Sequence, residues 1–181
     1  MSMNISRRSF MKGAAAASLA VAASTMLTGC DMPKWDDMFG GIFGNRSKTI
    51  NINKSESINI ALTDYRVDSV CVEYLPEFKV VNNAGSPVKV ADTVPSAGSN
   101  NAYYTLVPTF EYIGTSGNGH YINTSKSTLL NKEIAKGENA TGVLCLNMSK
   151  ISSYTGIELT LTAYDGNGNK VGEPAVFPFE K

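Results

Sequence analysis

The sequence predicts an all-β domain, a β-sandwich of about seven to nine short antiparallel strands. From Thr49 to Lys181, apolar and polar residues alternate over short stretches, the period-2 pattern of half-buried strands. Turn-forming residues separate these stretches at intervals of about 8–12 residues. No segment of this region has a convincing helical pattern; the best candidates for helical turns are 126–134 and 149–154.

The predicted strands are short apolar or alternating segments, at 50–52, 58–62, 70–74, 78–81, 88–90, 103–113, 120–122, 142–148, 157–164 and 171–179. Pro76 predicts an edge, a bulge or a break, and we expect Pro108 to break the longest candidate. Pro174 and Pro178 predict that the last strand lies at a sheet edge. Residues 165–169 (DGNGN) predict a hairpin turn, because Asp, Asn and Gly tolerate positive φ.

Two stretches, 78–83 (FKVVNN) and 136–142 (KGENATG), with the apolar strand that follows, carry a family resemblance. They resemble the immunoglobulin-like, telokin-like domain of extracytoplasmic bacterial lipoproteins. In that family a strand ends in Asn before a turn, and a Pro-Gly-Glu segment precedes an apolar strand; here Lys136 stands where Pro is common. The resemblance covers about 49–181 and implies an immunoglobulin-like β-sandwich without an assigned activity.

The N-terminus resembles a twin-arginine export signal. The motif residues are Ser6, Arg7, Arg8, Phe10 and Lys12. An Ala-rich run over 13–26 follows, too short and too weakly apolar for a spanning helix of about 20 residues. The sequence therefore predicts export from the cytoplasm by a receptor-read signal rather than a transmembrane anchor.

Residues 27–30 (LTGC) resemble the lipobox of bacterial lipoproteins. The resemblance implies that Cys30 carries a diacylglyceryl group and becomes the mature N-terminus. Two acyl chains suffice for stable anchoring, since each buried methylene contributes about 0.8 kcal/mol. We therefore expect a lipid-anchored protein on the extracytoplasmic side of the cell membrane, with a signal peptide at 1–29, a lipidated tether at 30–48 and a β-sandwich at 49–181.

The tether contains apolar residues at helical spacing. They are Trp35, Met38, Phe39, Ile42 and Phe43. A short amphipathic turn in the lipid headgroup layer is one interpretation. The other is that these side chains pack on the domain or belong to a plain linker.

The charge of the mature chain limits the classes of partner. Removal of Arg7, Arg8 and Lys12 leaves thirteen basic against sixteen acidic residues, a formal charge of −3. A nucleic-acid partner requires a basic surface, so none is expected. The partners expected are the membrane, through the lipid on Cys30, and a protein, peptide or glycan.

The two other cysteines, Cys71 and Cys145, each lie between strand-forming residues. An extracytoplasmic location permits a disulfide between them. The alternative is two buried thiols that act as small apolar side chains, which export of an already folded chain from a reducing compartment favours.

No residue set predicts catalysis, a metal site or a cofactor. His120 is the one histidine and has no nucleophile motif beside it. The spacing of Asp165, Asn167 and Asn169 is that of the start of an EF-hand loop, but Lys170 and Val176 occupy the positions that need Gly and Glu. The carboxylates are spread over different predicted strands, and include Asp64, Asp68, Glu73, Glu77 and Glu111.

The sequence thus favours a non-catalytic binding module attached to the membrane, with strand addition at an exposed edge as one mechanism. An alternative is an accessory subunit of an exported redox enzyme or metalloenzyme, because twin-arginine signals often serve such complexes. A third hypothesis is a hydrolase with a carboxylate pair.

Overall fold

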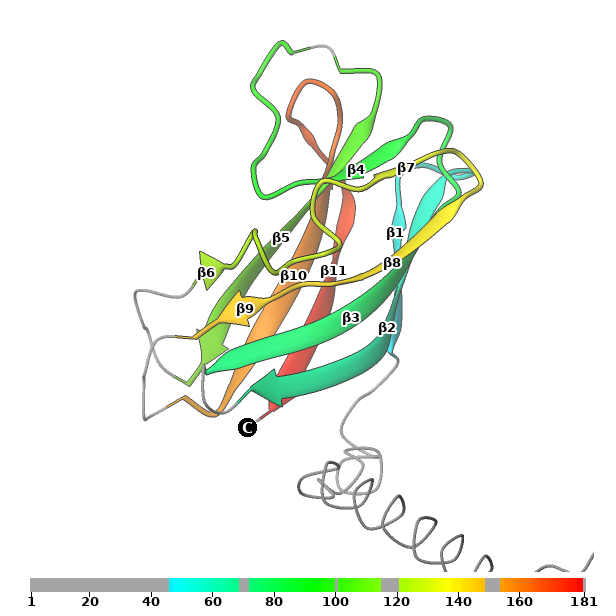
Figure 1. Ribbon diagram of the computed structural model, residues 1–181. Coiled ribbons are helices and arrows are strands. Elements are labelled where there is room, and N and C mark those ends of the chain that lie inside the picture. Colours follow the sequence, from blue (N-terminus) through cyan, green and yellow to red (C-terminus); the bar gives the residue numbers. More distant parts are fainter. Residues whose placement is uncertain (1–45, 69–71, 100, 115–120, 149–153, 181) are drawn as a thin grey trace, which may run out of the picture. The chain divides into compact units, whose positions relative to one another are not determined.

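A computed structural model describes residues 46–68, 72–99, 101–114, 121–148 and 154–180. Eleven strands in two sheets form an all-β sandwich (Figure 1), and the described residues contain no helix. The predicted fold class is confirmed. The candidate helical turn at 126–134 consists of turns and a short strand, and 149–153 lie outside the described residues.

Sheet A has the order β1-β2-β3-β9-β6, and β8 pairs with β3 on the same side as β9. Its strands, all antiparallel to their neighbours, are β1 (Ser47–Asn51), β2 (Ser57–Asp68), β3 (Glu73–Asn82), β6 (Tyr121–Ile122), β8 (Asn139–Val143) and β9 (Leu146–Asn147). The single strand expected at 142–148 is therefore two, separated at Leu144 and Cys145.

Sheet B has the order β11-β10-β5-β4-β7. Its strands are β4 (Val88–Val90), β5 (Tyr104–Ile113), β7 (Glu133–Ile134), β10 (Gly156–Tyr164) and β11 (Lys170–Glu180). The β4–β5 pair is parallel, an exception to the antiparallel expectation. The larger strand number comes mainly from the two-residue strands β7 and β9, which were not predicted as separate strands, whereas β6 was expected at 120–122.

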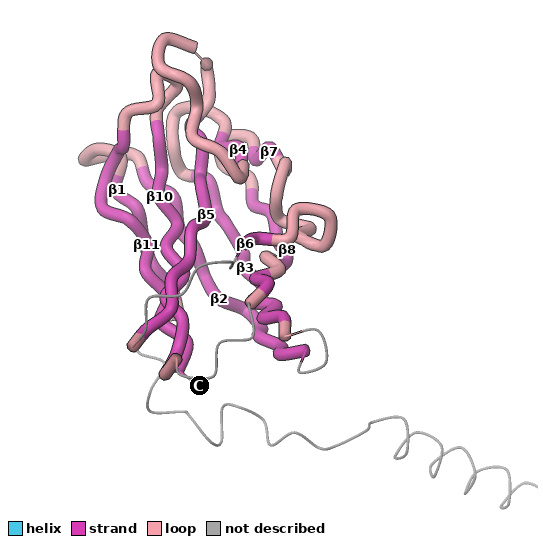
Figure 2. The backbone as a smooth tube through the Cα atoms, turned by 90° about the vertical axis from the view of Figure 1, so that its left-hand side faces the viewer, coloured by secondary structure: helices cyan, strands magenta, loops and turns pink. Residues whose placement is uncertain are grey.

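The inward faces of the two sheets form one apolar core. Figure 2 shows the two layers, with β2 and β3 in one and β5 and β10 in the other. Phe78 of sheet A and Phe177 of sheet B meet edge to face, with ring centroids 5.0 Å apart. Burial of each such side chain contributes about 1.5–3 kcal/mol. This core fixes the face of each sheet that remains outside.

The expected break is absent at both prolines, since β3 runs through Pro76 and β5 runs through Pro108. Pro76 lies opposite the gap between β8 and β9, where the ladder on that side is interrupted. Pairing of β4 with β5 ends at Leu106, two residues before Pro108. Each proline thus occupies a place where a neighbouring strand does not need its missing N–H.

The predicted edge position of the last strand is confirmed, since β11 is an edge of sheet B. A bulge shifts its register opposite Leu161 and Ala163. Gly172 lies in the bulge with φ of 65°, and an added Cβ would lie 2.4 Å from the carbonyl oxygen of Asn51. Gly172 therefore lets β11 approach β1 at the side where the two sheets meet.

The hairpin expected at 165–169 is confirmed between β10 and β11. One carboxylate oxygen of Asp165 accepts hydrogen bonds from the backbone N–H groups of Asn167 at 2.9 Å and Asn169 at 2.8 Å. The side-chain amide of Asn169 donates to the other oxygen, and these bonds lower the pKa of Asp165.

The two stretches that carry the family resemblance lie side by side. The N–H of Gly137 donates to the carbonyl of Asn82 at 2.8 Å, and the N–H of Asn82 donates to Glu138 at 2.9 Å. The buried side-chain amide of Asn82 also donates to the carbonyls of Ser86 and Ile134. The sequence pattern thus has a structural cause: one buried Asn ties two turns together.

Candidate functional site

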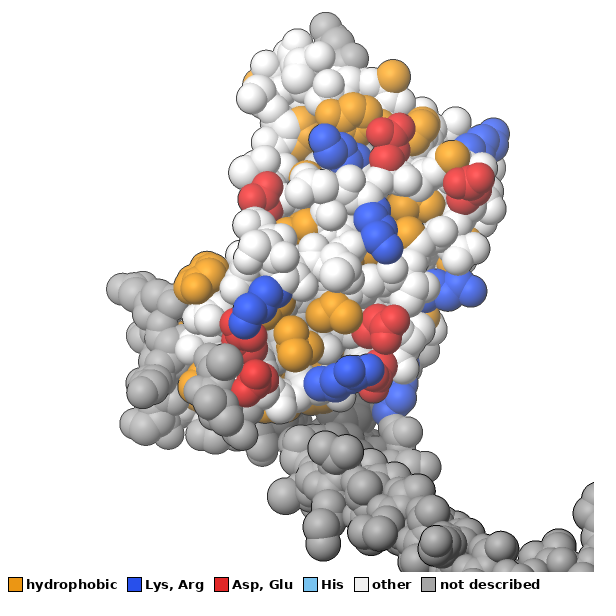
Figure 3. Space-filling model, viewed as in Figure 1, with side chains coloured by type: hydrophobic (Ala, Val, Ile, Leu, Met, Phe, Trp, Pro, Cys, Tyr) orange, Lys and Arg blue, Asp and Glu red, His pale blue; other side chains and the backbone are white. Residues whose placement is uncertain are grey.

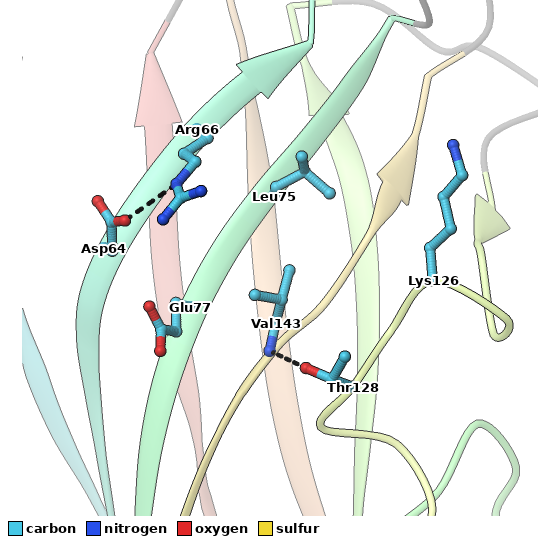
Figure 4. A pocket seen from close by; sticks show the side chains of 7 residues that line it. All are labelled: Asp64, Arg66, Leu75, Glu77, Lys126, Thr128 and Val143. Carbon is cyan, nitrogen blue, oxygen red and sulfur yellow. Dashed lines mark hydrogen bonds and ion pairs between the residues drawn. The ribbon is translucent and has the colours of Figure 1, made fainter. Parts of the chain in front are cut away.

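The outer face of sheet A contains a groove of about 390 Å³. Strands β2, β3 and β8 form its floor, and the segment 123–132 forms one wall (Figure 4). We call this segment the strap. The side chains that line the groove are Asp64, Arg66, Leu75, Glu77, Lys126, Thr128 and Val143.

Strand register places the floor side chains on one face. Asp64 lies opposite Glu77, Arg66 opposite Leu75, and Val143 opposite Glu77 on the other side of β3. A bulge between Leu62 and Asp64 changes the alternation of β2, so that Asp64 and Arg66 point outward.

Hydrogen bonds fix the strap along β8 and β9. The Thr128 hydroxyl accepts from the N–H of Val143 at 2.9 Å, and the Ser127 hydroxyl accepts from the N–H of Cys145 at 2.8 Å. The N–H of Asn123 donates to the Cys145 carbonyl at 2.8 Å. The strap thereby satisfies backbone groups of the outer strands and stands as a rigid wall.

A partly buried ion pair holds the strap over β3. The ammonium of Lys126 donates to both carboxylate oxygens of Glu73, at 2.9 and 2.8 Å. The Glu73 side chain is 5% exposed and that of Lys126 is 51% exposed. The hydrogen bonds from Lys126 are the main reason that the pKa of Glu73 is lowered, against the opposing effect of burial.

Cys145 is buried next to this ion pair. Burial, followed by the charge of Glu73, raises the pKa of the thiol to about 11. The thiol is therefore protonated and a poor nucleophile at neutral pH. Its predicted partner Cys71 lies outside the described residues, so the disulfide stays a prediction.

Charges of both signs surround the groove. The Nε atom of Arg66 binds Asp64 at 3.2 Å, with both side chains exposed. For Glu77, the described part of the chain provides no ion pair. Figure 3 shows this face, where acidic and basic side chains lie around small apolar areas. The groove can therefore contact an apolar group and a charged group at the same time.

A second hollow, of about 380 Å³, lies where β5 extends beyond β4. It is lined by Asp92, Pro108, Thr109, Phe110, Tyr121, Ile122 and Thr124. Tyr121 is 55% exposed, but among the described residues that line this hollow Asp92 alone is charged. Four charged side chains line the groove on sheet A, and each can make an ion pair or hydrogen bond with a ligand. We therefore take this groove as the candidate site.

Several carboxylates that the sequence places on different strands lie on the same face of a sheet in the structure. It places Asp64, Glu73 and Glu77 on the outer face of sheet A, and Glu111 on sheet B. Among the described residues, no three or more His, Cys, Asp or Glu side chains are arranged to hold a metal ion.

Sequence reasoning did not identify Arg66, Leu75, Lys126, Thr128 or Val143 as site residues. The alternation in β3 and β8 was a usable signal for Leu75 and Val143. No local signal marks the strap, because Lys126 and Glu73 are far apart in sequence.

Other predicted residues lie outside the described ranges. These are Cys30, the motif residues Ser6, Arg7, Arg8, Phe10 and Lys12, the tether up to residue 45, Cys71 and His120. In the part of the chain that the structure describes, no helix is long and apolar enough to cross a bilayer.

Comparison with known families identifies the N-terminal segment. The family model for the TAT (twin-arginine translocation) pathway signal sequence matches residues 4–24, which contain all five predicted motif residues. The protein is therefore exported across the cytoplasmic membrane. No curated protein matches the chain.

Proposed function

We propose that this exported protein is a lipoprotein, anchored through Cys30, whose β-sandwich binds a partner in the groove on sheet A. The observation that carries the proposal is the groove itself: an apolar floor of Leu75 and Val143 beside charged side chains, with a wall fixed by a partly buried ion pair. A preorganised wall lowers the entropy cost of binding.

The lipid anchor rests on the lipobox resemblance at 27–30 together with the export signal. The immunoglobulin-like domain class rests on the telokin-like resemblance and the sandwich architecture. A Cys30→Ser variant should leave the membrane fraction and lose incorporation of labelled fatty acid. Retention of label by this variant would contradict lipidation at Cys30.

Affinity capture from solubilised membranes tests the binding function. The bait is the full-length lipidated chain, as wild type and as Leu75→Asn, which makes the groove floor polar. The matched control is Val176→Asn, because Val176 is also half-buried and outward-facing, but on sheet B.

A stoichiometric ligand lost with Leu75→Asn and kept with Val176→Asn supports the proposal. Equal capture by both variants contradicts it. If the groove-dependent ligand is a subunit of an exported redox enzyme or metalloenzyme, the accessory-subunit hypothesis gains support over a free-standing binding module.

A further inference from the structure

We propose that the groove binds an extended peptide segment that carries a basic side chain two residues from an apolar one. The inference rests on the proposed binding function and adds the chemical class of the ligand. Three observations support it: two opposed carboxylates, two cations already engaged by other groups, and an apolar floor at the spacing of a strand.

The first observation is a like-charge pair. Asp64 and Glu77 lie directly opposite each other on neighbouring strands, and both point outward into the groove. Opposed like charges destabilise a sheet. A ligand cation beside Glu77 would reduce the repulsion that remains after Arg66 has paired with Asp64.

The second observation is that the groove's cations have partners. Arg66 binds Asp64, and Lys126 donates to both oxygens of the buried Glu73. An anionic ligand would compete with these carboxylates for the two cations. A basic ligand can pair with Glu77 while both existing ion pairs remain.

The third observation is the position of the apolar floor. Leu75 lies two residues from Glu77 along β3, and Val143 lies beside Glu77 on β8. Residues two apart on an extended chain point to the same side, about 6.6 Å from each other. A peptide with an apolar residue at one position and Arg or Lys two positions on therefore matches Leu75 and Glu77.

The size of the groove agrees with this ligand. Its volume of about 390 Å³ is near the lower end of ligand pockets, roughly 300–1,000 Å³. That volume suits one or two side chains rather than a larger ligand. A long basic side chain also supplies an apolar stem, which can cover Val143 while its charged end reaches Glu77.

Weak binding can be measured from shifts of the backbone amide NMR signals when peptide is added to the full-length chain in detergent micelles. The probes are the peptides Ser-Leu-Ser-Arg-Ser, Ser-Leu-Ser-Gln-Ser and Ser-Leu-Ser-Glu-Ser. The arginine peptide should shift signals of Leu75, Glu77 and Val143 and bind more tightly than the other two. Glu77→Gln should weaken it by about 2- to 5-fold, the range for an exposed ion pair.

The control variant is Glu111→Gln. Glu111 opposes Glu158 on the outer face of sheet B, so it belongs to a second like-charge pair away from the groove. This variant should leave the affinity unchanged. Equal binding of the arginine and glutamine peptides, tighter binding of the glutamate peptide, or equal losses from both variants would overturn the inference.

The same data separate this inference from the proposed function. Groove signals that shift without preference for arginine contradict the basic ligand and leave the groove as a binding surface. If no peptide shifts these signals while Leu75→Asn still abolishes capture from membranes, the ligand belongs to another chemical class. If no peptide shifts the groove signals and Leu75→Asn does not reduce capture from membranes, the binding function is contradicted as well.

Discussion

The outer faces of the two sheets both contain directly opposed carboxylates, in different surroundings. Sheet A opposes Asp64 to Glu77 and Asp68 to Glu73, and sheet B opposes Glu111 to Glu158. Two residues after Asp64 along the strands of sheet A, on the same face, Arg66 lies opposite Leu75, and the strap lies beside this pair. On sheet B the next pair is polar, Thr109 and Thr160.

This difference shows that opposed carboxylates alone do not make a site. What sheet A adds is an apolar floor and a wall, and the wall depends on the partly buried contact between Lys126 and Glu73. The strap and the opposed charges of the two faces can therefore be tested separately by substitution.

Loss of the strap cation should have the largest effect. Lys126→Met removes the half-exposed cation that donates to the buried Glu73 carboxylate, which costs about 2.5 kcal/mol of unfolding free energy, within the range for hydrogen bonds to a charged group. Denaturant unfolding measures the loss. Lys170→Met, at an exposed position in sheet B, should change stability by less than about 0.5 kcal/mol. Equal effects of the two variants would refute the structural role of the strap contact.

A methyl group beneath the strap should have the next largest effect. An added Cβ on Gly142 would lie 2.8 Å from the backbone nitrogen of Leu129, so Gly142→Ala must displace the strap or β8. We expect a loss of about 2 kcal/mol. Gly98→Ala is the control: its positive φ costs about 1 kcal/mol, but no atom lies within 4 Å of the added group. A smaller loss for Gly142→Ala than for Gly98→Ala would contradict close packing of the strap.

Acid should weaken the strap contact. Because Lys126 lowers the pKa of Glu73, the contribution of this carboxylate is complete above the ordinary glutamate pKa of about 4.3. It is lost as the pH falls through the lowered native pKa. The stability difference between wild type and Glu73→Gln, about 1.5 kcal/mol at neutral pH, should therefore shrink in acid. A difference that does not change between pH values of about 6 and 2 would contradict this assignment.

The smallest effect concerns the property that both faces share. Glu77→Gln and Glu111→Gln each remove one of two opposed carboxylates, so each should raise stability by up to about 0.5 kcal/mol. Thermal unfolding at low salt checks both variants, and added salt should reduce the gain. A clear loss of stability in Glu77→Gln would show that Glu77 has a structural role.

The sandwich class was predictable from sequence because its evidence is local. The alternation of apolar and polar residues predicted β2 and β10, and the turn-forming residues predicted the hairpin at 165–169. The paths through Pro76 and Pro108 were not predictable, because each depends on whether a neighbouring strand needs the missing N–H at that point.

The candidate site was less predictable than the fold. Alternation in β3 implies that Leu75 and Glu77 share a face. However, Asp64 and Arg66 join that face through a bulge, and the wall depends on contact between Glu73 and Lys126, which are distant in sequence. Such long-range pairs leave no local pattern.

The most direct test of the central claim is photo-crosslinking in cells that export the full-length chain. One variant carries a photoreactive aromatic amino acid at Arg66, an exposed position of the groove, and the other carries it at Glu158, an exposed position on sheet B. A specific adduct from position 66, absent from position 158, is the result that we predict. Adducts from position 158 alone, or from neither position, would contradict the assignment of the sheet A groove as the binding surface.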